Sequence, residues 1–324
     1  MNIAILGTGA YGLSIALMLN ENNNNIKMYT KFEEELNILN NNNGNPNLLP
    51  NIKLPDSIEY TTNMEYCINN SDIIFIMVPA GYVDDISKEL KNYYKDQYIC
   101  IGSKGIEQDT CLFVDEVVRK NINTSKIAVM SGPSFAVDIA SFVPIGLTLA
   151  SKDENTLNMI KNALENKYLK LRTCDDIIGV EICGSIKNII AIACGIIEGM
   201  KLPESSKAML ITESLHDIKE LIDALGGNKK TILSYAGIGD LVLTCTSNKS
   251  RNYTFGKMIG GKKSKNIINK YISNTTIEGL YTLKSIYKLL NNKKVNIPII
   301  DIMYKIIIEN EDINLIKKFL IEKK

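Results

Sequence analysis

The feature that most constrains the fold is a glycine-rich turn that follows the first apolar run of the chain. Residues 3–6 are apolar and lead directly into GTGAYG, a G-x-G-x-x-G pattern formed by Gly7, Gly9 and Gly12. The glycines permit a tight turn and close approach of the backbone to a pyrophosphate, and the free amides at the following helix start favour an anion. In this strand, turn and helix setting, the pattern predicts a dinucleotide-binding unit, with a merely structural glycine turn as the alternative.

Short apolar runs alternate with amphipathic stretches through the first half of the chain, which is typical of a parallel sheet covered by helices. The expected strands are residues 2–6, 26–30, 73–78, 98–101 and 127–130, with two more of undetermined direction near 145–150 and 169–173. Periods of three and four dominate later, and the expected helices are 178–200, 205–225, 276–290, 298–309 and 314–321. The predicted fold is α/β, with an N-terminal Rossmann-like doubly wound sheet (1–177) and a C-terminal all-helical domain (178–324).

Charge and composition favour a small ligand over a macromolecular surface. The formal net charge of +1 leaves little electrostatic attraction for nucleic acid or an anionic membrane. The apolar run at 189–197 is too short to cross a bilayer, and no signal peptide pattern precedes the first strand. We therefore expect a cytoplasmic protein without an integral membrane segment.

Seven cysteines without a C-x-x-C pair, together with a single histidine, predict free thiols and no metal site.

Two asparagine clusters, at residues 22–25 and 40–43, resemble low-complexity segments. Such clusters supply turn chemistry but little apolar surface for a core. We interpret both as polar loop filler that joins regular elements.

The end of the second expected strand leaves the choice between NAD and NADP open. An acid at this position would bind the ribose hydroxyls of NAD, but the segment ends in Thr30 and Lys31, and the first acid is Glu33. Lys31 could meet the 2′-phosphate of NADP, or it could be a solvated loop cation. The sequence predicts NAD or NADP without a preference.

Two further motifs follow expected strands. SKGIE places Lys104 at the carboxyl edge of the sheet, where open α/β folds bind ligands, although a surface lysine is the alternative. SGPSFA, which contains Gly132, Ser134 and Ala136, combines two hydroxyls with a turn that leads into a helix. Such turns also serve purely as helix caps, so both interpretations stay open for this motif.

The stretch EICGSIKNIIAIACG places Lys187 and Asn188 within an apolar helical run. On a helix, the side of Lys187 is lined by small residues at i−3, i+4 and i+7, which leaves room for a ligand. An unpaired ammonium in an apolar crevice would have a lowered pKa and could exchange a proton near neutral pH. The alternatives are a lysine that extends to solvent or one that pairs with Glu181.

The motif GIGDLVLTC places Asp240 among glycines and apolar residues, and Arg251 and Asn252 follow in SRNYTFG. An acid near a lysine can fix its orientation and charge, and a guanidinium suits a pair of phosphate oxygens.

His216, the single histidine, lies far from any motif and is expected at the surface or in a cap. Its isolation argues against the histidine–acid pairing of lactate- and malate-type dehydrogenases.

From residue 1 to about residue 300, the chain resembles the NAD(P)-dependent glycerol-3-phosphate dehydrogenase family in its bacterial form. The motifs that carry the resemblance are, in order, GTGAYG, SKGIE, SGPSFA, GSIKNIIAIACGIIEG, GIGDLVLTC, SRNYTFG and TIEGL. The resemblance implies a homodimer with a helical substrate and dimerisation domain. It also implies reversible reduction of dihydroxyacetone phosphate to sn-glycerol 3-phosphate, which feeds glycerophospholipid synthesis.

The resemblance also implies roles for individual residues. The catalytic set is Lys187, Lys104 and Asp240. The substrate set is Lys104, Gly132, Ser134, Asp240, Ser250, Arg251 and Asn252. The cofactor set is Gly7, Gly9, Ala10, Tyr11, Gly12, Lys31, Lys104, Ala136, Arg251 and Glu278, and no residue is assigned to a metal. This chain departs from many relatives at Ala10, Tyr11 and Lys31, where they carry Ser-Trp or Ser-Phe and an arginine or histidine.

In the implied reaction, Lys187 stabilises the charge that builds on the carbonyl oxygen and supplies a proton, while Arg251 holds the phosphate. A nearer alternative is a two-domain dehydrogenase of the 6-phosphogluconate or hydroxyacid type, which GIGDL followed by SRN disfavours. The alternative from another class is a non-catalytic dinucleotide sensor or scaffold. The retained set of charged residues argues against it.

Overall fold

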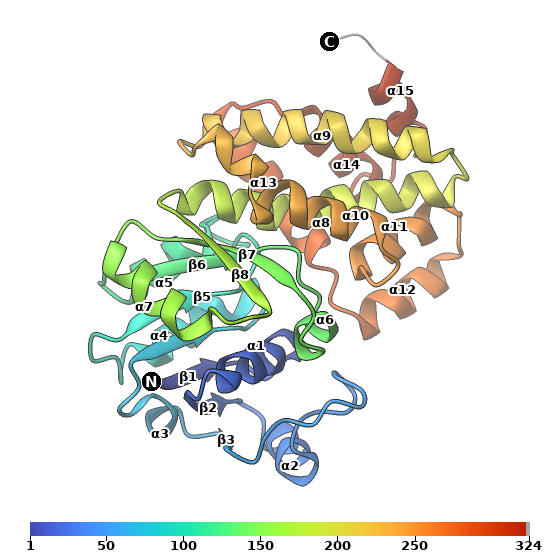
Figure 1. The fold of residues 1–324 in the computed structure, drawn as a ribbon. Helices are drawn as coiled ribbons and strands as arrows, with labels where there is room; N and C mark the ends of the chain where they lie inside the picture. The colour runs from blue at the N-terminus through green and yellow to red at the C-terminus, as the bar shows by residue number, and fades with distance from the viewer. Residues whose placement is uncertain (322–324) are drawn as a thin grey trace. The chain divides into compact units, whose positions relative to one another are not determined.

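The computed structural model describes residues 1–321, and the chain folds into two compact units (Figure 1). Unit 1 comprises Met1–Lys104 and Val114–Ile177. Unit 2 comprises Gly105–Phe113 and the chain from Ile178 onward. The change of unit at residues 177 and 178 lies where the sequence pattern changes from strands to helices. The last three residues of the expected helical domain, 322–324, lie outside the described part of the chain.

Unit 1 is built on a twisted sheet of eight strands. The strands are β1 (Asn2–Leu6), β2 (Asn25–Tyr29), β3 (Ile58–Thr61), β4 (Ile73–Ile76), β5 (Tyr98–Ile101), β6 (Ile127–Ser131), β7 (Ile145–Ala150) and β8 (Leu169–Cys174). Their order is β3-β2-β1-β4-β5-β6-β7-β8, and every neighbouring pair is parallel except β6 with β7. The strand order reverses direction between β1 and β4, which is the point where open α/β sheets bind ligands. The predicted Rossmann-like fold class is confirmed.

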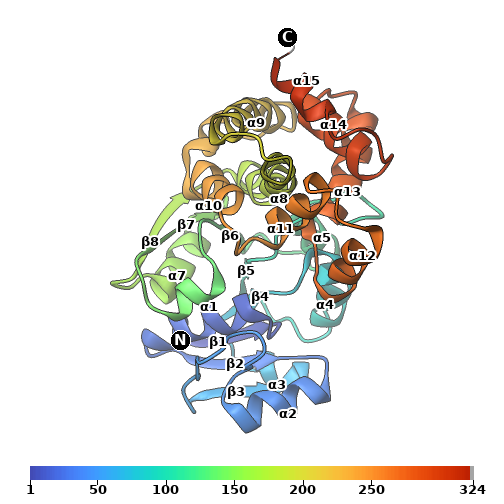
Figure 2. The same cartoon turned by 90° about the vertical axis from the view of Figure 1, so that its right-hand side faces the viewer.

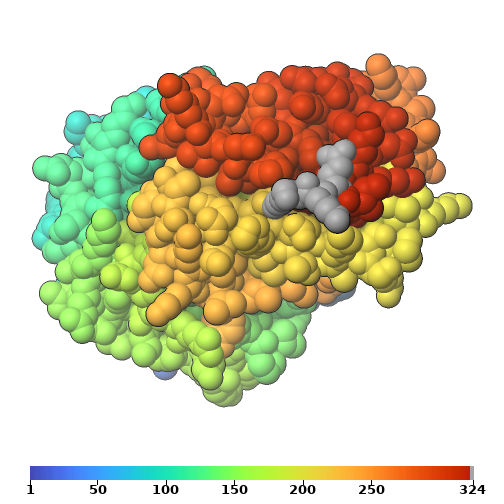
Figure 3. Space-filling model, turned by 90° about the horizontal axis from the view of Figure 1, so that it is seen from above, coloured from blue at the N-terminus to red at the C-terminus, as the bar shows by residue number. Residues whose placement is uncertain are grey.

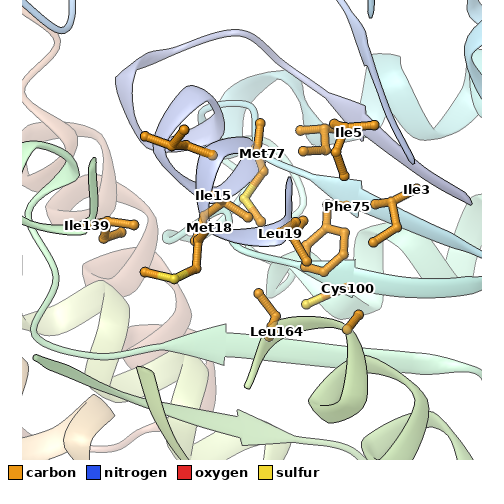
Figure 4. Packing of buried hydrophobic residues seen from close by; sticks show 14 of the residues in the cluster. Ile3, Ile5, Ile15, Met18, Leu19, Phe75, Met77, Cys100, Ile139 and Leu164 are labelled. Carbon is orange, nitrogen blue, oxygen red and sulfur yellow. The ribbon is translucent and has the colours of Figure 1, made fainter. Parts of the chain in front are cut away.

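Helices cover both faces of this sheet. They are α1 (Ala10–Glu21), α2 (Glu33–Asn42), α3 (Met64–Ile68), the 3-10 turn η1 (Ala80–Tyr82), α4 (Val83–Leu90), α5 (Val114–Asn121), α6 (Ala136–Ala140) and α7 (Glu154–Leu164). Figure 4 shows Ile15 and Leu19 of α1 facing Phe75 of β4 within the apolar core. Because α1 is buried along most of its length, the turn that precedes it is held rigidly against the sheet.

The first asparagine cluster is structural, so its interpretation as loop filler is wrong. The buried Asn24 side chain donates hydrogen bonds to the carbonyls of Leu19 (2.8 Å) and Ala163 (3.1 Å). Asn22 donates to the same Ala163 carbonyl at 2.9 Å. These bonds add side-chain donors to carbonyls near the ends of α1 and α7 and join the two helices.

Unit 2 is helical apart from an isolated bridge between Ile106 and Phe113, within the part of the chain that the structure describes. The expected helices are α8 (Ile177–Gly199), α9 (Glu204–Ala224), α13 (Glu278–Lys293), α14 (Pro298–Ile307) and α15 (Leu315–Ile321). The sequence pattern did not predict five further elements, which are η2 (Lys229–Leu233), η3 (Tyr235–Gly239), α10 (Asp240–Thr246), α11 (Arg251–Gly260) and α12 (Lys265–Asn274). In the space-filling view, the yellow residues of α9 lie beside the red residues of the C-terminal helices (Figure 3).

Helix α8 is the core helix of unit 2, and Figure 2 looks along it with other helices of the unit around it. Among residues 1–321 it alone is long and apolar enough to cross a membrane, but 94% of its most apolar window is buried in the structure. The burial is that of a core helix in a folded domain.

Helices α8 and α11 touch through their backbones. A Cβ atom added to Gly195 of α8 would meet the carbonyl oxygen of Tyr253, and one added to Gly256 of α11 would meet the carbonyl oxygen of Ile192. Glycine at these positions therefore allows an approach that any other residue would prevent. The contact places the first turn of α11 beside the middle of α8, which carries Lys187.

Candidate active site

Each unit contributes its own group of predicted residues. In unit 2, the ammonium of Lys187 lies 2.5 Å from Oδ1 of Asp240, and their side chains are 10% and 2% exposed. Thr244, one turn further along α10, donates a hydrogen bond to the Asp240 carbonyl at 2.6 Å. The predicted unpaired ammonium is therefore wrong, and so is the alternative of a lysine that extends to solvent. A buried ion pair fixes both the position and the charge of Lys187.

Side-chain amides connect Asn188, the residue after Lys187 on α8, to two other helices. The Gly279 amide donates to Asn252 Oδ1 (2.9 Å), and Asn252 Nδ2 donates to Asn188 Oδ1 (3.0 Å). Asn188 Nδ2 then donates to Glu278 Oε2 at 3.0 Å. The chain of bonds brings together Asn252 and Glu278, which the sequence analysis assigned to substrate and cofactor. The same bonds include Asn188, which was not among the predicted site residues. The sequence feature that could have identified it is an amide next to a lysine within an apolar helical run.

Residues at the start of α11 form the third part of this group. Ser250 caps the helix by accepting a hydrogen bond from the Tyr253 amide at 3.2 Å. Arg251 is exposed at the first helical position, and its carbonyl accepts a hydrogen bond from Tyr271 at 3.3 Å. A guanidinium at a helix N-terminus provides a charge and a dipole that both favour a phosphate.

In unit 1, the glycine turn has the geometry that a dinucleotide requires. Gly7 has a φ of +113°, and a Cβ there would lie 2.8 Å from the Met77 carbonyl oxygen. A Cβ on Gly12 would collide with the Gly7 carbonyl. At Gly9, the residue before α1, no described atom apart from those of Gly9 and its two chain neighbours lies within 4 Å of the Cβ position. Gly7 and Gly12 thus shape the turn, and Gly9 leaves the helix start accessible, so these residues fit a pyrophosphate.

Three predicted residues of unit 1 converge near this turn. The hydroxyls of Tyr11 and Ser134 are 3.4 Å apart, and Ser134 also donates to the Gly132 carbonyl at 3.2 Å. The ammonium of Lys104 lies 6.0 Å from the centre of the Tyr11 ring. Ser14 of α1 donates to the Ala136 carbonyl at 2.7 Å, which ties the SGPSFA turn to α1. The glycine turn and the motifs around Lys104 and Ser134 therefore form one group.

The end of β2 offers few acidic groups to a ribose. Glu33 accepts a hydrogen bond from Thr62 at 2.6 Å, and Glu35 accepts one from Thr30. Lys31 is exposed beside them. The two nearest carboxylates thus already have partners, while the cation is accessible.

Two exposed aromatic rings at the carboxyl edge of the sheet were missed by the sequence analysis. Phe32 follows β2 and is 64% exposed, and Tyr82 follows β4 and is 62% exposed. Large exposed rings at a ligand-binding edge are suited to stacking on a planar base. The sequence feature that could have identified these rings is an aromatic residue a few positions after each expected strand.

A Rossmann-like unit with a glycine turn, together with a helical unit that holds a buried lysine–aspartate pair, defines a two-domain nicotinamide-dependent dehydrogenase. Family models narrow this class. The NAD-dependent glycerol-3-phosphate dehydrogenase N-terminus matches residues 2–157, and the C-terminus of the same family matches residues 176–318. The chain belongs to the NAD-dependent glycerol-3-phosphate dehydrogenase family, and the family predicted from the sequence motifs is confirmed.

Individual relatives agree with the family match. A glycerol-3-phosphate dehydrogenase (NAD(P)+) of Staphylococcus epidermidis is 35% identical, covering 99% of this chain and 98% of its own. One of Fusobacterium nucleatum is 32% identical, covering 96% and 94%. The crystal structure of a glycerol-3-phosphate dehydrogenase from Coxiella burnetii superposes with a TM-score of 0.94 at 31% identity, covering 99% of both chains. D-mandelate dehydrogenase, at 14% identity and a TM-score of 0.64, shares the fold alone.

Proposed function

We propose that this chain catalyses the reversible reduction of dihydroxyacetone phosphate to sn-glycerol 3-phosphate with NADH or NADPH. The observation that carries the proposal is the buried pair of Lys187 and Asp240 in a chain of this family. Family membership supports the nicotinamide cofactor and the class of substrate.

Lys187 is the proton donor in the direction of reduction. The glycine turn would hold the nicotinamide cofactor, which when bound would supply the hydride, and negative charge would build on the carbonyl oxygen of the substrate. The Lys187 ammonium stabilises this oxygen and transfers its proton to it. Asp240 holds the ammonium in place and favours its charged form before the transfer, and Thr244 bonds to the backbone of Asp240.

Binding of the phosphate positions the reacting end of this small substrate. Arg251 at the start of α11 would hold the phosphate, with Ser250 and Asn252 beside it. In unit 1, Lys104 and Ser134 are the substrate residues that the family resemblance implies. Binding energy from a remote phosphate can then be used to orient the carbonyl for reaction.

The test is loss of reduced-nicotinamide absorbance when purified protein is mixed with dihydroxyacetone phosphate. Substrate-dependent loss is expected with at least one of NADH and NADPH, and no loss with either would overturn the proposal. A parallel panel containing 6-phosphogluconate with NADP+ and 2-hydroxy acids with NAD+ separates this activity from that of the related dehydrogenases.

We further propose that the enzyme is a cytoplasmic homodimer whose product supplies glycerophospholipid synthesis. The family resemblance supports these statements. Exposed apolar side chains on α9, η2, η3 and α10, which contact one another along the chain, also support self-association. They are Met209, Leu233, Ile238 and Val242. Exposed apolar residues on neighbouring elements are typical of an interface between subunits.

A further inference from the structure

A hydrogen-bonded cluster outside the assigned site joins three helices of unit 2. The ammonium of Lys207, on α9, donates to Glu198 Oε2 on α8 at 2.8 Å and to the Tyr253 hydroxyl on α11 at 2.9 Å. The same ammonium lies 5.4 Å from the centre of the Tyr253 ring. None of these three residues belongs to the sets assigned to substrate or cofactor.

Lys207 and Tyr253 are largely buried, whereas the charged partner Glu198 is 36% exposed. The Lys207 side chain is 14% exposed, and Tyr253 is 3% exposed. Burial alone would lower the pKa of Lys207, but hydrogen bonds to Glu198 and Tyr253 raise it above its ordinary value. The hydrogen bond from Lys207 lowers the pKa of Glu198. The lysine therefore stays protonated at neutral pH, and hydrogen bonds from a charged donor are stronger than those between neutral groups.

Tyr253 is held at both ends of the residue. Its side-chain hydroxyl is bound by Lys207, while its backbone amide donates to the capping Ser250. Its carbonyl oxygen lies against Gly195 of α8, where no Cβ could be accommodated. Arg251 and Asn252 immediately precede Tyr253 in the same helical turn. A displacement of Tyr253 would therefore move the residues proposed to hold the phosphate.

We propose that Lys207 and Tyr253 are positioning residues that hold the first turn of α11 in the orientation required for phosphate recognition. This inference deepens the proposed function and rests on it. Lys207 acts through Tyr253 and touches neither substrate nor cofactor. A purely structural role for the cluster would change stability without changing affinity for the phosphate.

Two substitutions remove the hydrogen bond between Lys207 and Tyr253 with little change in side-chain shape. Tyr253→Phe deletes the hydroxyl alone, and Lys207→Met removes the ammonium but keeps a chain of similar length. Each is expected to raise KM for dihydroxyacetone phosphate about fivefold or more, because a bond to a charged group is lost. The inhibition constant of inorganic phosphate, used as a competitive inhibitor, is expected to rise in parallel. We expect kcat and KM for the nicotinamide cofactor to change by a smaller factor than KM for dihydroxyacetone phosphate.

Lys257 provides the matched control. It lies on the same helix, and its ammonium is 3.7 Å from the other oxygen of Glu198, but its side chain is 47% exposed. Lys257→Met removes this neighbouring cation and leaves the bond between Lys207 and Tyr253 in place. We expect its KM and phosphate inhibition constant to stay within twofold of the wild type. Lys207→Arg is expected to restore part of the loss seen in Lys207→Met.

The double variant tests whether the two side chains act as one unit. If they do, Lys207→Met combined with Tyr253→Phe raises KM by less than the product of the two single effects. Thermal unfolding of every variant is measured alongside the kinetics. Should Lys207→Met fail to fold, Tyr253→Phe, which lacks one oxygen atom, decides the question.

The outcomes separate the inference from the proposed function. If the wild type does not reduce dihydroxyacetone phosphate, both fail. If the wild type is active and the Tyr253→Phe and Lys207→Met enzymes match Lys257→Met in KM and phosphate inhibition, the positioning role alone is overturned. A loss confined to kcat or to KM for the cofactor would overturn it equally.

Discussion

Lys187 and Asp240 form an ion pair that is almost completely shielded from water. Lys187→Met removes the proton donor but keeps most of the side-chain volume. We expect kcat to fall by about 10²-fold to 10⁴-fold, the range typical of a general acid, while affinity for NAD(P)H changes little. Steady-state kinetics and a fluorescence titration of the cofactor measure the two quantities. A near-normal rate would remove the role assigned to Lys187.

Lys31 is the residue at which we predict a preference between cofactors. Lys31 is exposed directly after β2, so its ammonium is accessible to a 2′-phosphate. Lys31→Glu is expected to lower the ratio of kcat/KM for NADPH to that for NADH about tenfold or more. Lys53→Glu, at an exposed position elsewhere in unit 1, is the charge-matched control. An unchanged ratio in Lys31→Glu would identify Lys31 as a solvated cation.

The sequence motifs identified most residues of the candidate site, but they did not predict how these residues contact one another. Spacing along the chain could not pair Lys187 with Asp240, because 53 residues separate them and the packing of α8 against α10 is a tertiary property. Family resemblance supplied both residues without predicting their contact. Asn188 and Phe32 were missed as members of the site, since a single amide or ring has no periodicity to mark it.

The contact between α8 and α11 is an interaction of whole elements. Gly256→Ala places a methyl group against the backbone of Ile192, and a backbone atom cannot rotate away. Overpacking of this kind costs about 1–3 kcal/mol, so we expect a lower free energy of unfolding, measured by denaturant titration. We also expect a higher KM for dihydroxyacetone phosphate, because α11 carries Arg251.

Gly81→Ala is the control for this substitution, since no described atom lies within 4 Å of its Cβ position. Its free energy of unfolding should change by less than about 0.5 kcal/mol, as for most surface substitutions. If Gly256→Ala and Gly81→Ala have the same free energy of unfolding, α8 and α11 can move apart to accommodate the methyl group without a loss of stability.

Long elements were predicted better than short ones. Helices α8 and α9 each span more than twenty residues, and their apolar periodicity is evident in the sequence. The four-residue strand β3 was missed because only Ile58 in it is fully buried. Helix α12 has no fully buried residue, so its apolar pattern was too weak to indicate a helix. The interpretation of Asn24 as loop filler was wrong for a different reason. Buried polar side chains that bind backbone carbonyls leave no apolar pattern in the sequence.

At the scale of the whole molecule, the exposed apolar residues of α9, η2, η3 and α10 predict the oligomeric state. Leu233, which is 71% exposed, is the most exposed of the four. The wild type is expected to have a mass of about 72 kDa by light scattering, twice that of the 36.1 kDa chain. Leu233→Glu is expected to shift the equilibrium toward a monomer, because it places a charge in a desolvated contact.

Leu48→Glu introduces the same charge at an exposed leucine of unit 1 and should leave the mass unchanged. A wild type that stays monomeric at every concentration tested would contradict the predicted dimer. Dissociation by both substitutions would instead indicate a general effect of added charge.

The short segment Gly105–Phe113 leaves unit 1 and returns to it within nine residues. A protease that cut this segment once would produce one fragment ending after β5 and another beginning before β6. Those two strands are neighbours in the same sheet, with Cys100 paired to Ala128. A nicked molecule would therefore run as two bands in detergent yet remain one particle in native buffer, because the break falls between strands that stay hydrogen-bonded.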